Sequence, residues 1–162
     1  MGAKVNTLIA QGQFWRLFTP MLLHGGVVHL LVNCYSLHNI GPAVERQFGK
    51  DQFLAVYLGS GFAGNYMSYR MCPNNAVGAS GAIFGLVGAM GVYLLRHKDL
   101  FGAPGERQLQ SLGTAIALNA VFGAMSKRID NWAHLGGLLG GGAIAYLIGP
   151  NLVMVQDGGH GL

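Results

Sequence analysis

Apolar residues are concentrated in five stretches of the chain, with polar or charged residues between them. The stretches span residues 21–44, 53–69, 77–95, 109–125 and 132–148. Each is roughly 17–24 residues long, close to the ~20 residues that a helix needs to cross the hydrocarbon core of a bilayer. The pattern predicts an all-α polytopic membrane helix bundle with five transmembrane helices.

Turn-forming and charged residues mark the breaks between these stretches. Residues 73–75, a proline followed by two asparagines, interrupt the chain before the third stretch. We therefore expect one transmembrane domain over residues 21–149. A pre-helical loop region over residues 1–20 precedes it, and a short polar tail over residues 150–162 follows it.

The composition favours a membrane domain over a typical soluble one. Of the 162 residues, 51% are hydrophobic and 10% are charged, whereas soluble domains carry about 25% charged residues. The 27 glycines are typical of transmembrane helices that pack closely through small residues. The formal net charge of +4 comes from scattered basic residues, so no nucleic-acid-binding surface is expected.

Glycines spaced four residues apart predict a close contact between two of the helices. Gly81 and Gly85 share one helix face, and Gly136 and Gly140 repeat the spacing in the last apolar stretch. A simpler interpretation is that glycine is common in membrane helices. If the two faces do meet, the residues beside them come together.

A serine and a histidine lie beside these two glycine faces, namely Ser80 and His134. Polar groups within a membrane are costly unless they are paired or line a wet cavity, so they are candidates for function. Together they suggest a nucleophile and its base. The alternative is that Ser80 only caps a helix. The soluble-hydrolase motif G-x-S-x-G is excluded because Ala82 occupies the last glycine position.

His29 and Asn33 are four residues apart and share a helix face. Both can donate hydrogen bonds, so they suit an oxyanion hole, in which a donor is worth roughly 3–4 kcal/mol. They could equally be a buried polar pair that ties two helices together. His24 and His29 point about 140° apart on a helix, and no Cys or carboxylate cluster accompanies them, so no metal site is expected.

Two further residues bear on the chemistry of His134. Asp130 lies four residues before it and could orient the imidazole, but it follows two basic residues and is typical of a loop charge. We therefore favour a Ser–His dyad over a triad. Phe84 lies one turn after Ser80 and could stack on the imidazole, or it could belong to the ordinary core. Cys34, one of two cysteines, is expected in the core.

Taken together, these residues resemble the rhomboid family of intramembrane serine proteases over about residues 13–149. Several separated motifs appear in the family's order, which makes the resemblance specific. They are Trp15-Arg16, His24-x4-His29-x3-Asn33, Gly41-Pro42-Ala43-Val44-Glu45-Arg46, Gly78-Ala79-Ser80-Gly81 and Ala133-His134-x-Gly136.

The resemblance implies catalytic roles for four residues. Ser80 would be the nucleophile and His134 the general base. His29 and Asn33, with the backbone N–H of Ser80, would form the oxyanion hole. The implied substrates are transmembrane segments with helix-breaking residues, cleaved in or near the bilayer from a water-filled cavity. The expected partners are therefore transmembrane proteins and the lipid bilayer, with no cofactor, metal or nucleic acid.

The resemblance also implies supporting roles. Gly78 would let the backbone approach the substrate closely, and His24 would belong to a hydrogen-bonded loop beside the site. Trp15, Arg16 and Glu45 would be structural, tying a loop to a helix.

Two departures from the family pattern stand out. The family core has six helices, and the first precedes the Trp-Arg motif, so this chain is expected to lack that helix. Phe84 occupies a position where many members have tyrosine. The sequences of residues 33–37 and 128–132 are most similar to those of plant and algal plastid rhomboids. A multi-pass integral membrane protein of a plastid membrane is therefore expected.

Three functions are compatible with the sequence to different degrees. An intramembrane serine endopeptidase is favoured because the serine, both histidines and the asparagine are all present. A catalytically inactive rhomboid-like pseudoprotease that binds membrane helices is the alternative, supported by the missing first helix. A small channel or transporter would suit the helices but not the placement of Ser80 and His134.

Overall fold

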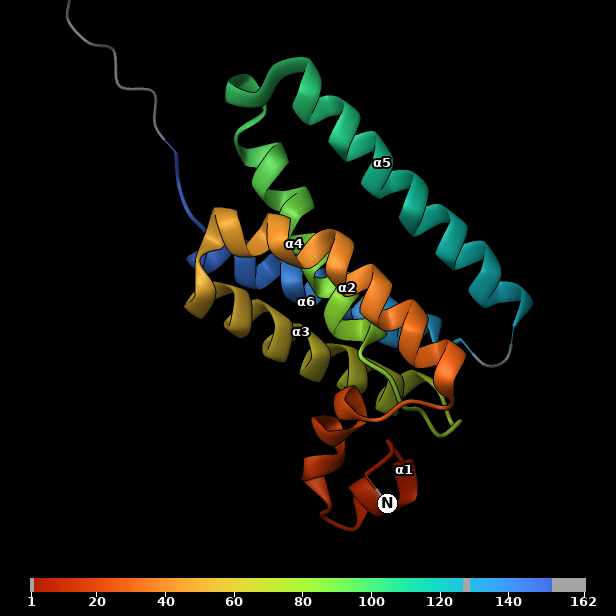
Figure 1. Ribbon diagram of the computed structural model, residues 1–162. Helices are drawn as coiled ribbons and strands as arrows, with labels where there is room; N and C mark the ends of the chain where they lie inside the picture. Colours follow the sequence, from red (N-terminus) through yellow and green to blue (C-terminus); the bar gives the residue numbers. More distant parts are fainter. Residues whose placement is uncertain (1, 127–128, 153–162) are drawn as a thin grey trace, which may run out of the picture.

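The computed structural model describes residues 2–126 and 129–152, and this part of the chain is helical (Figure 1). The expected all-α class is confirmed. One isolated antiparallel bridge, between Lys4 and Ala76, is the sole β-type pairing in the described residues. The elements are α1 (Asn6–Ala10), the 3₁₀ turns η1 (Phe14–Leu17) and η2 (Thr19–Leu22), α2 (Val27–Phe48), α3 (Lys50–Met71), α4 (Ser80–Arg96), α5 (Lys98–Met125) and α6 (Asn131–Ile148).

Each of the five apolar stretches contains one long helix, and the expected boundaries are furthest off at the starts of α2 and α5. Residues 21–26 belong to η2 and the loop after it, so α2 starts later than predicted. The stretch over residues 109–125 is the second part of a longer helix, α5, which kinks at Gly102 (φ 48°). Residues 2–20, expected as loop, hold α1, η1 and the start of η2.

By length and hydropathy together, none of the helices in the described residues qualifies as a membrane-spanning segment. The expected number of five spans is therefore not confirmed.

Helices α3, α4 and α6 form the centre of the bundle, and α2 packs on α4 and α3. A cluster of buried apolar side chains from α2, α3, α4 and α6 forms the core, including Val44, Val56, Leu86 and Met90. Helix α5 lies on the outside (Figure 1) and contacts mainly α4.

The predicted contact between the two glycine-bearing helices is confirmed, but its register on α6 is wrong by one residue. Gly137 and Gly141 face α4, because a Cβ at either would overlap the carbonyl of Gly81 or Gly85. Since 3.6 residues make a turn, the next residue on a helix points about 100° away. The glycines that had been expected at this contact therefore face another helix.

That other helix is α3, and α6 thus carries a second glycine face. A Cβ at Gly136 would lie 2.8 Å from the carbonyl oxygen of Ala63, and one at Gly140 would lie 2.6 Å from the Ala63 Cβ. Glycines on both sides allow α6 to approach two helix backbones at once. This places α6, and with it His134, firmly between α3 and α4.

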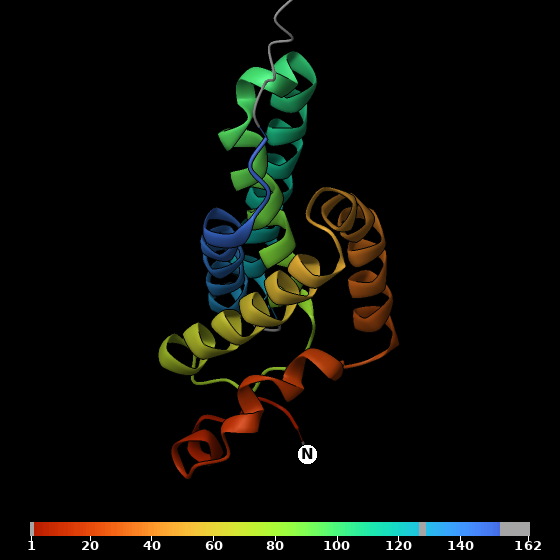
Figure 2. The ribbon, with the colours of Figure 1, turned by 90° about the vertical axis from the view of Figure 1, so that its left-hand side faces the viewer.

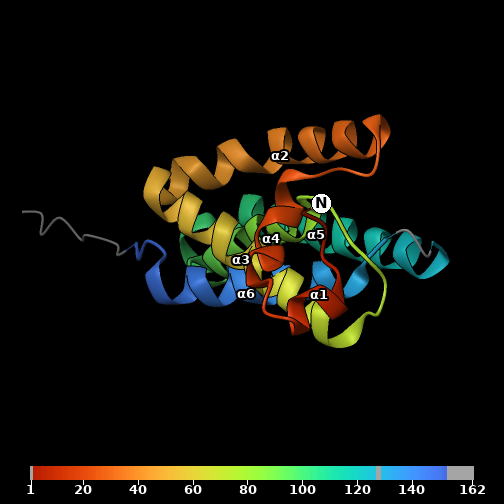
Figure 3. The same ribbon diagram turned by 90° about the horizontal axis from the view of Figure 1, so that it is seen from below.

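The segment before α2 lies across one end of the bundle, where α3 ends and α4 begins (Figures 2 and 3). Long-range hydrogen bonds hold it there. Asn65 Nδ2 of α3 donates to the Leu17 carbonyl (2.9 Å), and the Gly78 N–H donates to the Pro20 carbonyl (2.9 Å). The loop that leads into α4 is therefore packed against this segment.

Candidate active site

Ser80 is the first residue of α4, and a glycine two residues earlier makes this start possible. Gly78 has a φ of 130°, in the region that favours glycine because it has no Cβ. Ala79 occupies the N-cap position, and no side chain caps the helix. The alternative that Ser80 is only a helix cap is therefore wrong: its hydroxyl bonds elsewhere.

The partner of the Ser80 hydroxyl is His134, in the first turn of α6. Its Nε2 lies 2.9 Å from Ser80 Oγ. The glycine contact between α4 and α6 brings the N-terminal turns of both helices together. In the tautomer with its proton on Nδ1, the imidazole can accept the hydroxyl proton through Nε2. This is the geometry of a serine activated by an adjacent base.

Asp130 is the N-cap of α6 and does not orient the imidazole. Its Oδ1 accepts from the Ala133 N–H (3.0 Å), and its Oδ2 accepts from the Ser68 hydroxyl of α3. Within the described residues, no hydrogen-bond partner reaches the buried Nδ1 of His134. The arrangement is a pair of side chains rather than a triad.

The Phe84 ring lies flat against the His134 imidazole. Their centroids are 4.3 Å apart and their planes differ by 8°. Phe84 lies one helical turn after Ser80, so the residue that positions the ring comes from the same helix as the hydroxyl. Of the two alternatives for Phe84, stacking on the imidazole is the one observed, and it fixes the plane of an imidazole whose Nδ1 has no partner in the described part of the chain.

His29 lies over the backbone just before Ser80. A Cβ at Gly78 would be 2.8 Å from both Cε1 and Nε2 of its ring. Its Nδ1 accepts from the Gly25 N–H (3.2 Å), and the His24 ring meets it edge-on at 5.3 Å. His24 thus lies beside this part of the site, but its buried Nε2 has no hydrogen-bond partner among the described residues.

Asn33 is buried one turn further along α2. Its Nδ2 donates to the His29 carbonyl (2.8 Å), and its Oδ1 has no partner in the described residues. One of the two N–H groups of the amide is thus used inside α2, and the other is left for a further acceptor.

Helix α4 contributes an electrostatic element of its own. The first N–H groups of a helix have no intrahelical acceptor, and the N-terminus carries about half a positive charge. Because Ser80 begins α4, its backbone N–H lies at this positive end. Negative charge that develops beside the Ser80 hydroxyl is therefore stabilised.

The three residues expected to tie a loop to a helix do not act together. Arg16 is buried and bonds to Gln13 Oε1 (2.7 Å) and to the Ala3 carbonyl (2.8 Å), not to Glu45. Glu45 is about 27 Å along α2 from its start, at 1.5 Å per residue, and is exposed. Trp15 is also exposed. Arg16 therefore stabilises the N-terminal segment instead.

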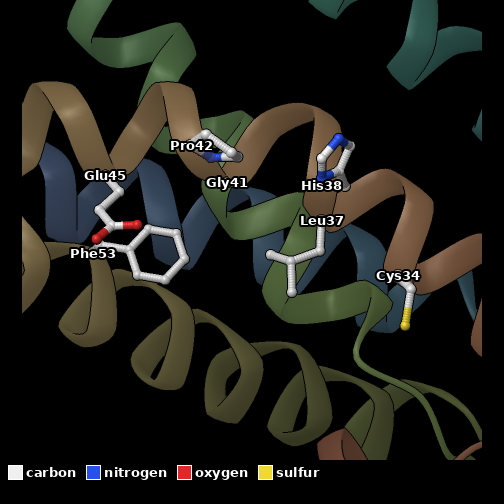
Figure 4. Close-up of a pocket in the computed structure, with 7 residues that line it drawn as sticks. All are labelled: Cys34, Leu37, His38, Gly41, Pro42, Glu45 and Phe53. Atoms are coloured by element: carbon white, nitrogen blue, oxygen red, sulfur yellow. The ribbon is translucent and has the colours of Figure 1, made fainter.

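Glu45 lines an open groove of about 400 Å³ between α2 and α3. At its other end lies Cys34, which is exposed rather than in the core as expected (Figure 4). Neither Ser80 nor His134 lines this groove. It is separate from the site.

Two buried polar side chains near the site, those of Ser68 and Lys4, were not predicted from the sequence. Ser68 is fully buried and bonds to Asp130. Lys4 is also fully buried and donates to two carbonyls of the loop before α4. Ser60, Gly64 and Ser68 follow the same four-residue spacing as the glycines, so the spacing could have identified α3 as a third contact helix.

Metal binding finds no support in the part of the chain that the structure describes, because no group of three or more His, Cys, Asp or Glu side chains is arranged for it. The expected absence of a metal stays a prediction.

The sequence matches the family profile described as Rhomboid domain over residues 11–151. It is 43% identical over 152 residues to rhomboid protease GluP of Bacillus subtilis (strain 168), a match that covers 91% of this chain and 29% of that protein. The protein named "Putative rhomboid protease YdcA", from the same organism, is 41% identical over 144 residues, which cover 88% of this chain and 71% of YdcA.

A plant relative is similar over almost the whole chain. RHOMBOID-like protein 9, chloroplastic, of Arabidopsis thaliana is 32% identical over 160 residues, which cover 97% of this chain and 36% of that protein. The chain therefore spans about a third or less of two of these three relatives.

Proposed function

Because this chain belongs to the rhomboid family, we propose that it is an intramembrane serine endopeptidase that cleaves transmembrane segments. The observation that carries the proposal is the 2.9 Å contact between Ser80 Oγ and His134 Nε2. The two residues are 54 positions apart in the chain and come from different helices, and the glycine contact holds both at the same end of the bundle.

In the proposed reaction, His134 accepts the proton of Ser80 as Oγ attacks the scissile carbonyl carbon. The carbonyl oxygen becomes an oxyanion, which the Ser80 N–H at the positive end of α4 stabilises. His134 then gives the proton to the leaving amine, and the acyl-enzyme remains. Water, deprotonated by His134, attacks the ester and releases Ser80 with its proton restored.

His29 and Asn33 are the proposed further donors to the oxyanion. His29 is suited to this because its ring already contacts the backbone two residues before Ser80. The second N–H of the Asn33 amide is free to donate once the first is bonded to His29. Together with Gly78, which leaves room for the ring, these residues define the side of Ser80 on which the substrate carbonyl would lie.

Rhomboid proteins are integral membrane proteins, and we propose that the five long helices of this chain cross a bilayer. A plastid membrane is proposed only on the similarity to the chloroplastic relative, at 32% identity. The Bacillus relatives match at 43% and 41%, so a bacterial membrane is an equal candidate.

One observation favours a second function, a pseudoprotease that binds membrane helices without cleaving them. The Asn33 amide already donates one of its two N–H groups to the His29 carbonyl, so at most one N–H of this side chain remains for an oxyanion. The two functions differ in the fate of the bound helix, since a pseudoprotease would hold it intact.

The test is cleavage of a fluorescent model transmembrane segment by the purified chain in phosphatidylcholine liposomes. Ser80→Ala and His134→Ala are expected to remove cleavage while still binding the segment. Ser111→Ala and His38→Ala, on exposed positions of α5 and α2, are the matched controls and should keep full activity. Capture of an intact segment by the wild-type chain would instead establish the pseudoprotease.

A further inference from the structure

A fully buried lysine lies at the end of the bundle that carries the site. Lys4 has no exposed surface, although lysine is almost never fully buried unless it is paired. Its Nζ donates to the Cys72 carbonyl (2.6 Å) and the Asn74 carbonyl (2.7 Å). Both acceptors belong to residues 72–79, which connect α3 to Ser80.

The backbone of Lys4 holds the same loop a second time. Its N–H donates to the Ala76 carbonyl (2.9 Å), and its carbonyl accepts from the Ala76 N–H (3.1 Å). Asn6 adds to this, since its Nδ2 bonds to the carbonyls of Tyr69 and Cys72 (both 3.0 Å). Four residues after Ala76 the chain reaches Ser80, so this clamp determines where α4 starts.

The charge of Lys4 also acts on the element that carries His134. Burial lowers the pKa of Lys4, and the carboxylate of Asp130 opposes this, so the two charges attract each other. Asp130 caps α6 through the Ala133 N–H, and its carbonyl accepts from the His134 N–H (3.1 Å). A displacement of the Asp130 corner would therefore displace His134.

We propose that Lys4 is a positioning residue for the reaction, one that keeps Ser80 and His134 within hydrogen-bond distance by holding the α3–α4 loop and the Asp130 corner together. The inference rests on the proposed function. A neutral side chain of similar size would fill the same space without bonding to the carbonyls or attracting Asp130. Such a substitution would disturb the geometry of the site and leave the fold intact.

The experiment compares wild type with Lys4→Met in the liposome cleavage assay, and it separates kcat from KM. A shift of about 1 Å at a reacting pair can cost up to 10²-fold, so kcat is expected to fall by about tenfold or more while KM changes little. Lys50→Met, at the exposed first residue of α3, is the control and should keep both values. The unfolding temperature of each variant gives the folded fraction by which kcat is corrected.

A double-mutant cycle with Asp130→Asn tests the connection to α6. The kcat losses of the single variants are expected not to multiply in the double variant, because both act on the same corner. Lys4→Gln, which can still donate to one carbonyl, is expected to fold and to have an intermediate kcat.

Three results would overturn the inference. The first is a Lys4→Met chain with wild-type kcat per folded molecule, and the second is independent losses in the cycle. The third is a failure of both Lys4→Met and Lys4→Gln to fold, which would make the residue a requirement of the fold alone. If wild type neither cleaves nor captures the segment, the proposed function fails first, and that outcome differs from all three.

Discussion

Gly78 sets the geometry of the backbone that enters the site. Its φ of 130° is strained for any residue with a Cβ, and the His29 ring fills the space where a Cβ would lie. Glycine is therefore required at this position, two residues before Ser80, for two reasons: the backbone conformation and the space that the His29 ring occupies.

A comparison of Gly78→Ala with Gly12→Ala separates the effect of backbone strain from the effect of steric overlap with His29. Gly12 has a φ of 95° but nothing within 4 Å of a Cβ. Both variants are expected to lose about 1–3 kcal/mol of unfolding free energy from backbone strain. Only Gly78→Ala should also lose cleavage activity, by tenfold or more, because it displaces His29. Equal activity in the two variants would refute this role of Gly78.

Single residues differ in how far the sequence alone reveals them. Ser80 and His134 could be predicted as a pair, because each is a polar residue beside a glycine face in an apolar stretch. Lys4 and Ser68 could not, since a lysine in a polar segment and a serine in a helix are both ordinary at the surface. Their importance comes from contacts 62 to 70 positions away in the chain, which no local pattern encodes.

At the scale of elements, the close approach of α4 and α6 holds the site together. Gly88 of α4 lies against the Leu138 carbonyl of α6, so a Cβ there would overlap backbone. Gly91, one turn further along α4, has nothing within 4 Å of a Cβ. The same helix thus contains one glycine in close contact with α6 and one glycine with space for a side chain.

Gly88→Ala and Gly91→Ala are therefore expected to have opposite effects. Gly88→Ala should lower the unfolding free energy by about 2 kcal/mol or more, since backbone cannot move aside as a side chain can. Gly91→Ala should raise it by up to about 1 kcal/mol, because alanine is the better helix former. Thermal unfolding in detergent measures both. A loss of stability in both variants would mean that the close contact is not what makes Gly88 necessary.

The five long helices could be predicted from the apolar stretches, but their contacts could not be predicted to the residue. Four of the five glycines in α6, those at 136, 137, 140 and 141, allow two alternative faces, and both are used. The pattern identified one pair and assigned it to the wrong neighbour. Helix α5 starts at Lys98, before its apolar stretch. Its first turns contain charged residues, which a helix outside the core can carry, so the apolar pattern did not include them.

At the scale of the whole molecule, the N-terminal segment is joined to the bundle through a buried charge. Burial lowers the pKa of Lys4 below its ordinary value of 10.5, with Asp130 opposing the shift. Between the lowered pKa and 10.5, the unfolded chain binds a proton that the folded chain does not. The unfolding free energy contributed by this group therefore rises with pH across that interval.

Lys4→Met removes this titration. The wild-type unfolding free energy is expected to rise relative to that of Lys4→Met as the pH approaches 10.5, with a slope of at most about 1.4 kcal/mol per pH unit. Unfolding in mixed detergent micelles over this pH range measures the difference. A constant difference between the two proteins would show that Lys4 has the same pKa in the folded and unfolded chains.

Labelling of Ser80 by a fluorophosphonate tests most directly whether the whole molecule assembles a reactive serine. The probe is applied to wild type, Ser80→Ala, His134→Ala and the control Ser111→Ala, and the modified residue is identified by mass spectrometry. We expect labelling of Ser80 in wild type and in Ser111→Ala, and none in the other two variants. Absence of labelling in folded wild-type protein, or equal labelling in His134→Ala, would contradict the assignment of Ser80 and His134 as nucleophile and base.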